Sequence, residues 1–358
     1  MELGLLWLLV VLCRGQVCPQ YTCEVQGMAA GTCGYYNALE KEWSIQECED
    51  GLVCVQLTPS VATSNYTCQS FPPPLPSPAY PGEPCTSNSD CFLWQDFSLG
   101  CASNACQGKP QGELCSRVYE CQPGFTCIAD QCIPQKAAGQ TCTSDLDCVN
   151  TSGCDFAFSG QPGICIPYLS IRPGEPLRSC PGFQLNSLSP VSNVNYLCES
   201  GSCVSGPDMC IEALESKQSL PVNCTSDASV CTAGNPPTGL QILGTCEGCG
   251  YSEQGSTFCR LFPGDSYFSK LLSATASWLA SPALQSCNSA RRLSCMSTVW
   301  KQSAYQQWMY YYLATEYYGM LADAPKCVIA TLFPEYSEAK KEAGAVVIGV
   351  TLISILGL

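Results

Sequence analysis

Cysteine is the residue type that dominates the chemistry open to this sequence. The chain has 31 cysteines among 358 residues and no histidine. Cysteines at this density belong either to a disulfide framework in an oxidising compartment or to a set of zinc sites. Because zinc sites usually combine cysteine with histidine, the composition favours disulfides. Cys13 lies in an apolar N-terminal segment, so that an even 30 cysteines remain, as complete pairing requires.

The same composition closes most routes to catalysis. Without histidine, neither a Ser-His-Asp nor a Cys-His site can form. Cys246 and Cys249 make a C-x-x-C pair, which is redox-active in thioredoxin-like folds. No βαβ pattern surrounds this pair, and a structural role is the better interpretation. Carboxylates are scattered through loops rather than paired on a scaffold, as glycoside hydrolysis would need. We therefore expect no enzymatic activity, no catalytic residue, no metal site and no cofactor.

An internal repeat organises the cysteines between residues 82 and 165. Each of three copies follows the pattern G-x-x-C-x5-C, with two further cysteines after a variable gap. Four cysteines per copy can close two bridges, and copies of about 25–30 residues are too short to build a core without them. The repeat cysteines are Cys85, Cys91, Cys101 and Cys106, then Cys115, Cys121, Cys127 and Cys132, then Cys142, Cys148, Cys154 and Cys165.

This pattern resembles the N-terminal cysteine-rich motif of Dickkopf proteins and the short EB-like modules of extracellular proteins. The resemblance covers Gly82–Cys165 and lies in the spacing of glycine and cysteine. The adjacent Cys-Cys pair of a Dickkopf domain and a colipase-like second domain are absent. The resemblance implies a disulfide-knotted extracellular module, and it carries no role in Wnt signalling.

Composition changes along the chain indicate the remaining domains. Six cysteines precede a Pro-rich stretch that is expected to be an extended spacer, and the segment after the last dense cysteines is rich in helix formers. The expected domains are a signal peptide (1–15), an N-terminal six-Cys module (16–70), a Pro-rich linker (71–81), three repeats (82–171), a second cysteine-rich domain (172–262), a membrane-proximal helical segment (263–330) and a GPI-attachment signal with an apolar tail (331–358).

Cysteine parity predicts one long-range link. If the N-terminal module and the repeats close on themselves, the nine cysteines of the second domain cannot pair completely among themselves. At least one of them is then expected to pair with a cysteine of the helical segment, namely Cys287, Cys295 or Cys327.

Two helices are expected in the helical segment. Ser281-Pro282 favours the start of a helix that runs through Cys287 and Cys295, and on one straight helix these two lie about 12 Å apart and cannot pair. Arg291-Arg292 on this helix is interpreted as solvated charge rather than a processing site.

The second helix carries an aromatic stripe at helical spacing, for which the core of a helical hairpin is preferred over a ligand platform. Tyr310 and Tyr311 lie on the other face and are the candidate ligand contacts.

Both ends of the chain indicate export. Leu3–Leu12 is an apolar run of signal-peptide length, too short to span a bilayer, and cleavage is expected between Gly15 and Gln16. Ala343–Leu358 is uncharged, rises about 24 Å as a helix against ~30 Å of hydrocarbon, and has no basic cluster after it. A GPI signal with attachment at Ser337 is preferred over a short single-pass anchor or a last buried element.

Charge and sequons complete the expectation. A net charge of −14 disfavours nucleic acid as a partner. Asn65, Asn150 and Asn223 begin N-glycosylation sequons, of which the first two are expected to be used, while Cys224 hinders the third.

The sequence thus predicts small disulfide-rich, loop-dominated modules with short β-hairpins, followed by a C-terminal α-helical hairpin. The expected function is that of a non-enzymatic GPI-anchored glycoprotein on the outer leaflet of the plasma membrane. It would be a coat, adhesion or receptor-like protein that binds an extracellular protein or glycan. The alternative is a secreted disulfide-rich binding module, such as a protease inhibitor or a signalling antagonist.

Overall fold

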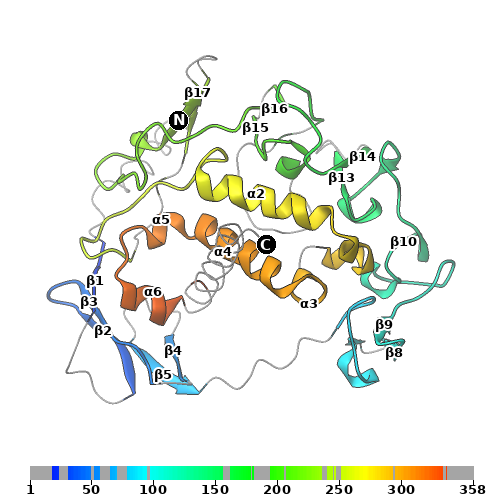
Figure 1. Ribbon diagram of the computed structural model, residues 1–358, viewed down its shortest axis with the longest axis horizontal. Coiled ribbons are helices and arrows are strands. Elements are labelled where there is room, and N and C mark those ends of the chain that lie inside the picture. Colours follow the sequence, from blue (N-terminus) through cyan, green and yellow to red (C-terminus); the bar gives the residue numbers. More distant parts are fainter. Residues whose placement is uncertain are drawn as a thin grey trace, which may run out of the picture. The chain divides into compact units, whose positions relative to one another are not determined.

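The computed structural model describes residues 18–336 except 24–30, 50–51, 57–64, 71–78, 95–96, 156–161, 179, 181–193, 205–206, 236–239, 245, 247–250, 293–294 and 334–335. Figure 1 shows short strands followed by helices in the C-terminal third. The chain divides into two compact units, each made of several segments. Unit 1 comprises Met1–Pro74, Leu214–Phe268 and Met309–Leu358, and unit 2 comprises Leu75–Ala213 and Ser269–Trp308.

The three predicted repeats lie in unit 2, and each closes two disulfides of its own. The first cysteine of each copy pairs with the third and the second with the fourth: Cys85–Cys101 and Cys91–Cys106, Cys115–Cys127 and Cys121–Cys132, Cys142–Cys154 and Cys148–Cys165. The prediction of self-contained repeats is confirmed. Because the bridging cysteines themselves make up most of each buried cluster, the disulfides take the place of an apolar core.

Each repeat is built from a 3₁₀ turn and a hairpin. The turns are η1 (Asn88–Asp90), η2 (Val118–Glu120) and η3 (Asp145–Asp147). The hairpin strands are β8 (Gly100–Ala102) with β9 (Ala105–Gln107), β10 (Phe125–Ile128) with β11 (Gln131–Pro134), and β13 (Ser152–Asp155) with β14 (Gly163–Pro167), which also pairs with β12 (Thr141–Cys142). The first repeat adds β6 (Leu93–Trp94) and β7 (Phe97–Ser98).

The glycine at the start of each repeat has a positive φ, a backbone conformation that favours glycine over other residues. Gly82, Gly112 and Gly139 have φ of 87°, 85° and 86°, in the left-handed region where a Cβ is unfavourable. Each glycine N–H donates to the carbonyl of the fourth cysteine of its own copy, so the glycine turn is hydrogen-bonded to the second strand of the hairpin.

The structure reveals a fourth copy that the sequence pattern did not show. Gly174 has φ of 89°, and its N–H donates to the carbonyl of Cys210, as the glycines of the first three copies do. The bridges Cys180–Cys203 and Cys198–Cys210 repeat the same pairing order. The elements of this copy are η4 (Val194–Leu197), β15 (Cys203–Val204) and β16 (Met209–Cys210).

Unit 1 contains a five-stranded sheet in the order β1-β3-β2-β5-β4. The strands are β1 (Gln20–Cys23), β2 (Thr32–Asn37), β3 (Glu42–Ile45), β4 (Leu52–Gln56) and β5 (Tyr66–Ser70). Its core joins Tyr21, Trp43 and Ile45 of the sheet to Val328 of helix α6 (Lys326–Leu332). A further four-cysteine group, bridged Cys224–Cys246 and Cys231–Cys259, belongs to the same unit with η5 (Ala228–Val230), β17 (Thr232–Asn235) and β18 (Leu240–Leu243).

The bridge predicted from parity, between the second cysteine-rich domain and Cys287, Cys295 or Cys327, is not formed, because Cys287 pairs with Cys295 and Cys327 pairs with Cys23. Cys327 pairs with Cys23, across 304 positions of the chain, and not with a cysteine of the second cysteine-rich domain. The N-terminal six-Cys module is therefore not closed on itself. Only Cys33–Cys54 and Cys48–Cys68 are bridges between described cysteines of that module, whereas Cys23 crosses to the C-terminal helix.

The C-terminal region is helical, as predicted. Its helices are α2 (Ser266–Leu279), α3 (Met296–Val299), α4 (Gln302–Glu316), α5 (Tyr318–Leu321) and α6. Within unit 2, Trp308 of α4 is buried and its Nε1 donates to Thr275 Oγ1 of α2 at 3.0 Å, so part of the aromatic stripe is core. Within the described part of the chain, no helix has the length and apolar character needed to cross a membrane.

Candidate functional site

The candidate site in unit 2 is the segment Ser281–Cys295, which contacts several repeats and is here called the docking segment. It contains two 3₁₀ turns, η6 (Pro282–Ser286) and η7 (Ser289–Arg291), rather than the single helix predicted. Ser281 and Asn288 each accept a hydrogen bond two residues ahead, from Ala283 N and Ala290 N, and thus each starts a separate turn.

The prediction that Cys287 and Cys295 cannot pair was wrong. Cys287 ends η6 with extended backbone (φ −82°, ψ 139°), which breaks the helical path between the two cysteines. Their Cα atoms lie 6.1 Å apart, and they form a disulfide with each other. The disulfide consequently closes the second part of the docking segment, residues 287–295, into a small ring that contains Asn288 and the two arginines.

Arg292 is the central side chain of the docking segment. It is 1% exposed, and its guanidinium donates to the third repeat through Nη1 to Ser152 O at 2.7 Å and through Nη2 to Asp145 O at 2.6 Å. Nη1 also donates to Tyr168 Oη at 3.0 Å. The interpretation of Arg292 as solvated charge was therefore wrong. A buried guanidinium is stable here because carbonyl oxygens satisfy its fixed donors.

A common geometry links the docking segment to two repeats. Asn288 Nδ2 donates to Val118 O and Cys121 O at 3.3 and 2.8 Å, which are the carbonyls three residues apart at the 3₁₀ turn of the second repeat. Arg292 Nη2 donates to the equivalent pair in the third repeat, Asp145 O and Cys148 O. One side-chain N–H group thus satisfies two turn carbonyls in each case.

The third repeat makes the same kind of interaction in the opposite direction, with the donor in the repeat and the acceptors in the docking segment. Asn150 Nδ2 donates to Leu284 O at 3.0 Å and to Cys287 O at 2.7 Å, again carbonyls three residues apart at a 3₁₀ turn. Asn150 is 1% exposed. A glycan on this nitrogen has no room in the folded chain, so the expected glycosylation of Asn150 is incompatible with these contacts. The side chains of Asn65 and Asn223 are exposed.

The first repeat contacts the docking segment through charge. Arg291 Nε lies 3.6 Å from Glu83 Oε1, and its guanidinium lies 4.4 Å from the centre of the Tyr80 ring. The Glu83 side chain is 3% exposed, so this ion pair is shielded from solvent at the carboxylate end. The docking segment therefore holds three successive repeats.

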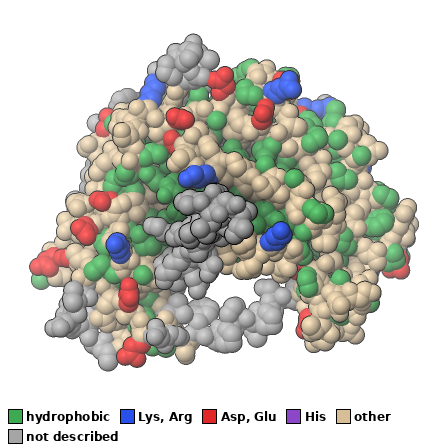
Figure 2. Space-filling model, viewed as in Figure 1, with side chains coloured by type: hydrophobic (Ala, Val, Ile, Leu, Met, Phe, Trp, Pro, Cys, Tyr) green, Lys and Arg blue, Asp and Glu red, His purple; other side chains and the backbone are tan. Residues whose placement is uncertain are grey.

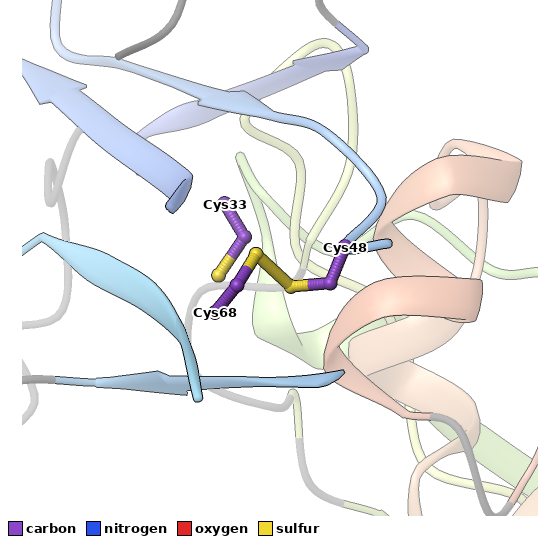
Figure 3. Close-up of side chains that lie close together, drawn as sticks. All are labelled: Cys33, Cys48 and Cys68. Atoms are coloured by element: carbon purple, nitrogen blue, oxygen red, sulfur yellow. A yellow bond between two sulfur atoms is a disulfide. The ribbon is translucent and has the colours of Figure 1, made fainter. Parts of the chain in front are cut away.

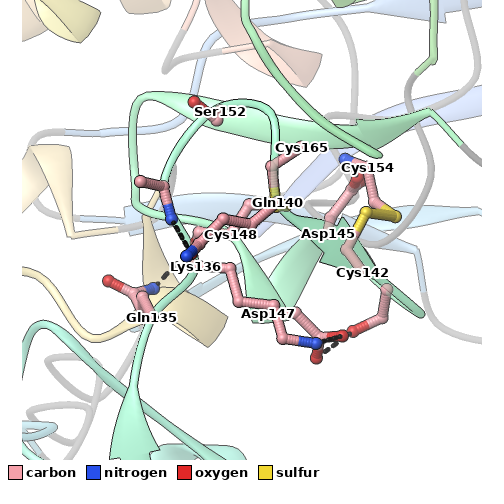
Figure 4. Close-up of a disulfide and its surroundings, with 12 residues drawn as sticks. Gln135, Lys136, Gln140, Cys142, Asp145, Asp147, Cys148, Ser152, Cys154 and Cys165 are labelled. Carbon is pink, nitrogen blue, oxygen red and sulfur yellow. Dashed lines mark hydrogen bonds and ion pairs between the residues drawn. A yellow bond between two sulfur atoms is a disulfide. The ribbon is translucent and has the colours of Figure 1, made fainter. Parts of the chain in front are cut away.

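Inside the repeats, a carboxylate closes each 3₁₀ turn. Asp147 Oδ2 accepts from Thr143 N at 2.7 Å and from Thr143 Oγ1 at 2.9 Å (Figure 4). Asp90 and Glu120 occupy the same position in the other two copies. Burial opposes ionisation of Asp147, but these hydrogen bonds and nearby Lys136 outweigh it and hold the pKa of Asp147 below its usual value.

These pKa shifts predict acid sensitivity. A carboxylate whose folded-state pKa is lowered contributes stability that is complete above its unfolded pKa and is lost as the pH falls through the folded pKa. We expect the unfolding temperature to decrease as the pH is lowered below about 4. The substitution Asp147→Asn is expected to weaken this pH dependence. Burial raises the pKa of Asp145, with the opposite sign, and the charge of Asp147 adds to this rise, so Asp147→Asn changes the pH dependence through both carboxyl groups. An unchanged pH profile of unfolding temperature in the variant would contradict this role.

Groups of three cysteine sulfurs within 4.8 Å of one another have the spacing of metal ligands, but the disulfides explain them. In Figure 3, Cys48 and Cys68 form one bridge and Cys33 belongs to the next. The same holds for the groups Cys85/Cys91/Cys101, Cys115/Cys121/Cys132, Cys142/Cys148/Cys165 and Cys224/Cys231/Cys259. A metal ligand must be a thiolate, which a bridged sulfur is not. Cys246 of the C-x-x-C pair is also bridged, to Cys224, as a structural role predicts.

Tyr310 and Tyr311 lie in a tyrosine cluster of unit 1. Tyr310 Oη donates to Tyr267 Oη at 3.4 Å, and its ring centre lies 5.5 Å from Tyr311 and 5.6 Å from Tyr336. Burial raises the pKa of Tyr310 above its usual value. Burial also raises the pKa of Tyr318, to about 12. Both candidate contact residues are half-buried.

Charge is thinly spread on the face seen in Figure 2, where Asp, Glu, Lys and Arg side chains are scattered among uncharged atoms. No protein family, curated protein or solved structure matches this chain. The resemblance to Dickkopf-type and EB-like modules stays a prediction. Gly15, Gln16 and Ser337, the predicted processing and attachment residues, lie outside the described residues.

Sequence reasoning missed the docking segment, although one signal was present. Ser281-Pro282 and Asn288 are both residues typical of helix starts, and two starts seven residues apart indicate two short turns. The fourth repeat also left a signal, because Gly174-Glu175-Pro176 matches Gly82-Glu83-Pro84. Leu177 stands where the first cysteine would be, and that cysteine follows at position 180.

Proposed function

We propose that this chain is a non-enzymatic surface protein whose disulfide-stapled ectodomain is held at the plasma membrane by a C-terminal GPI anchor. The observation that carries the proposal is the disulfide framework. Fourteen bridges join pairs of described cysteines. Such a framework indicates an extracellular or secreted protein, because reducing compartments keep thiols unpaired.

The anchor is supported by the sequence at the C-terminus. Ala343–Leu358 is an uncharged tail of 16 residues, and Ser337 begins a short polar stretch before it. The bridge between Cys327 and Cys23 fixes the chain ten residues before Ser337 to the sheet of unit 1. An anchor at Ser337 would therefore hold a segment that is covalently part of the folded unit.

A binding role is supported by the absence of histidine and by the kind of side chains that are available for contact. Tyr310 and Tyr311 combine an aromatic ring with a hydroxyl, and such side chains contact both sugar faces and protein surfaces. The proposed ligand is an extracellular protein or glycan, and the proposed roles are coat, adhesion or receptor-like binding. The low density of basic residues disfavours nucleic acid.

A secreted binding module, such as a protease inhibitor or a signalling antagonist, is the second candidate. The same disulfide framework favours it, since small secreted modules are stapled in this way. The two candidates differ in where the intact chain ends up.

Truncation separates them. We expect the full chain to be labelled by a membrane-impermeant biotin reagent on intact cells, and a chain that ends at Glu342 to be found in the medium. If the full chain is instead recovered from the medium with residues 343–358 still attached, the secreted module is correct.

A further inference from the structure

Asn150 combines a complete glycosylation sequon with complete burial. The sequon is Asn150-Thr151-Ser152. The side chains of Asn150 and Ser152 are each 1% exposed, and Ser152 O accepts a hydrogen bond from Arg292 Nη1 at 2.7 Å. The first and third residues of the sequon are thus part of the surface on which the docking segment lies.

The atom that would carry the glycan is the atom that binds the docking segment. N-linked transfer joins C1 of the first sugar to the asparagine Nδ2, which loses a proton, while the lipid diphosphate of the sugar donor leaves. In the folded chain, Nδ2 of Asn150 donates to Leu284 O and Cys287 O. A bulky, hydrated glycan must remain in solvent. Glycosylation of Asn150 and docking of Ser281–Cys295 are therefore mutually exclusive.

The order of synthesis gives glycosylation the first opportunity. Leu284 and Cys287 follow Asn150 by 134 and 137 positions. At about 5–20 residues per second, the chain needs roughly 7–27 s to reach them. During that interval Asn150 is not covered by the docking segment, although the bridges Cys142–Cys154 and Cys148–Cys165 can already close.

We propose that Asn150 is a conditional modification site that receives an oligosaccharide, from a lipid-linked donor, only in chains whose docking segment has not docked. Folded molecules carry no glycan at Asn150, and a glycan there prevents docking. The proposal rests on export, which the proposed function requires. Asn65 and Asn223, whose side chains are exposed, have no such conflict.

Site occupancy in the full chain tests the proposal. Protein is collected separately from the surface of intact cells and from inside them, deglycosylated in heavy-oxygen water, and mapped by mass spectrometry. We expect no occupancy of Asn150 in surface protein. In Arg292→Ala, which weakens docking, we expect occupied Asn150 in the intracellular protein and a loss of surface protein.

Ser152→Ala supplies the matched variant, because it removes the sequon while Asn150 and the backbone carbonyl of residue 152 remain. Combined with Arg292→Ala, it is expected to abolish the added mass at Asn150. Surface protein that carries a glycan at Asn150 would overturn the proposal, as would an unmodified Asn150 in the intracellular Arg292→Ala protein. Cleavage after Gly15 reports export independently, so an uncleaved chain without any glycan would show that the proposed function itself has failed.

Discussion

Replacing Arg292 by alanine is expected to release the docking segment from the third repeat. The substitution leaves Ser152 O, Asp145 O and Tyr168 Oη without the donors that they have in the folded chain. Each unsatisfied buried acceptor costs about 1–3 kcal/mol. With three acceptors left unsatisfied, we expect the free energy of opening this region to fall by at least about 3 kcal/mol.

Hydrogen exchange measures this effect directly, because it reports local opening while the disulfides stay intact. Amides of the docking segment and of residues 145–155 are expected to lose protection in Arg292→Ala. Arg172→Ala is the control, since Arg172 is exposed and its substitution is expected to change stability by no more than about 0.5 kcal/mol. Equal protection in the two variants would contradict the role assigned to Arg292.

Removing the Cys23–Cys327 bridge is expected to have the second large effect. A cross-link stabilises mainly by restricting the unfolded chain, and a separation of 304 gives about 5–6 kcal/mol in the chain-entropy relation. Other bridges inside this loop shorten its effective length, so this is an upper value. For the local bridge Cys48–Cys68, with a separation of 20, the same relation gives about 3 kcal/mol.

The double substitutions Cys23→Ser/Cys327→Ser and Cys48→Ser/Cys68→Ser are therefore compared by denaturant unfolding. The first pair is expected to lose more stability than the second. A chain cut once within residues 71–78 gives a second readout. It should stay in one piece without reductant, because the Cys23–Cys327 bridge joins the N-terminal fragment to the rest of the chain and Cys18 is bridged as well. Two fragments that separate before reduction would contradict the bridge.

The repeat architecture could be predicted from the sequence because the disulfides that form it join cysteines close together in the chain. Each pair of bridges closes within 11 to 17 positions, so the spacing of cysteine and glycine carries the information. The fourth copy escaped because Leu177 stands where the first cysteine would be. Its positive-φ glycine and its pairing order remain the same.

The contacts of the docking segment could not be predicted from the sequence, because the residues that it contacts are far away in the chain. Asn150 looks like a surface sequon until Leu284 and Cys287, more than 130 positions later, accept its hydrogen bonds. Arg292 likewise looks like surface charge until the carbonyls of the third repeat surround it. The parity argument was wrong because it assumed that the N-terminal module closes on itself, whereas Cys23 of that module pairs with Cys327.

The proposed place of this protein on the cell surface is tested most directly by enzymatic release. Intact cells that express the full chain are treated with phosphatidylinositol-specific phospholipase C, and the ectodomain is followed by an epitope inserted after the predicted cleavage site at Gly15. The chain that ends at Glu342 is the control, because it reaches the medium without the enzyme. We predict that the ectodomain moves from the cells to the medium on treatment, and that the released chain ends near Ser337. Full-length protein that stays on the cells, with residues 343–358 retained, would contradict the anchor.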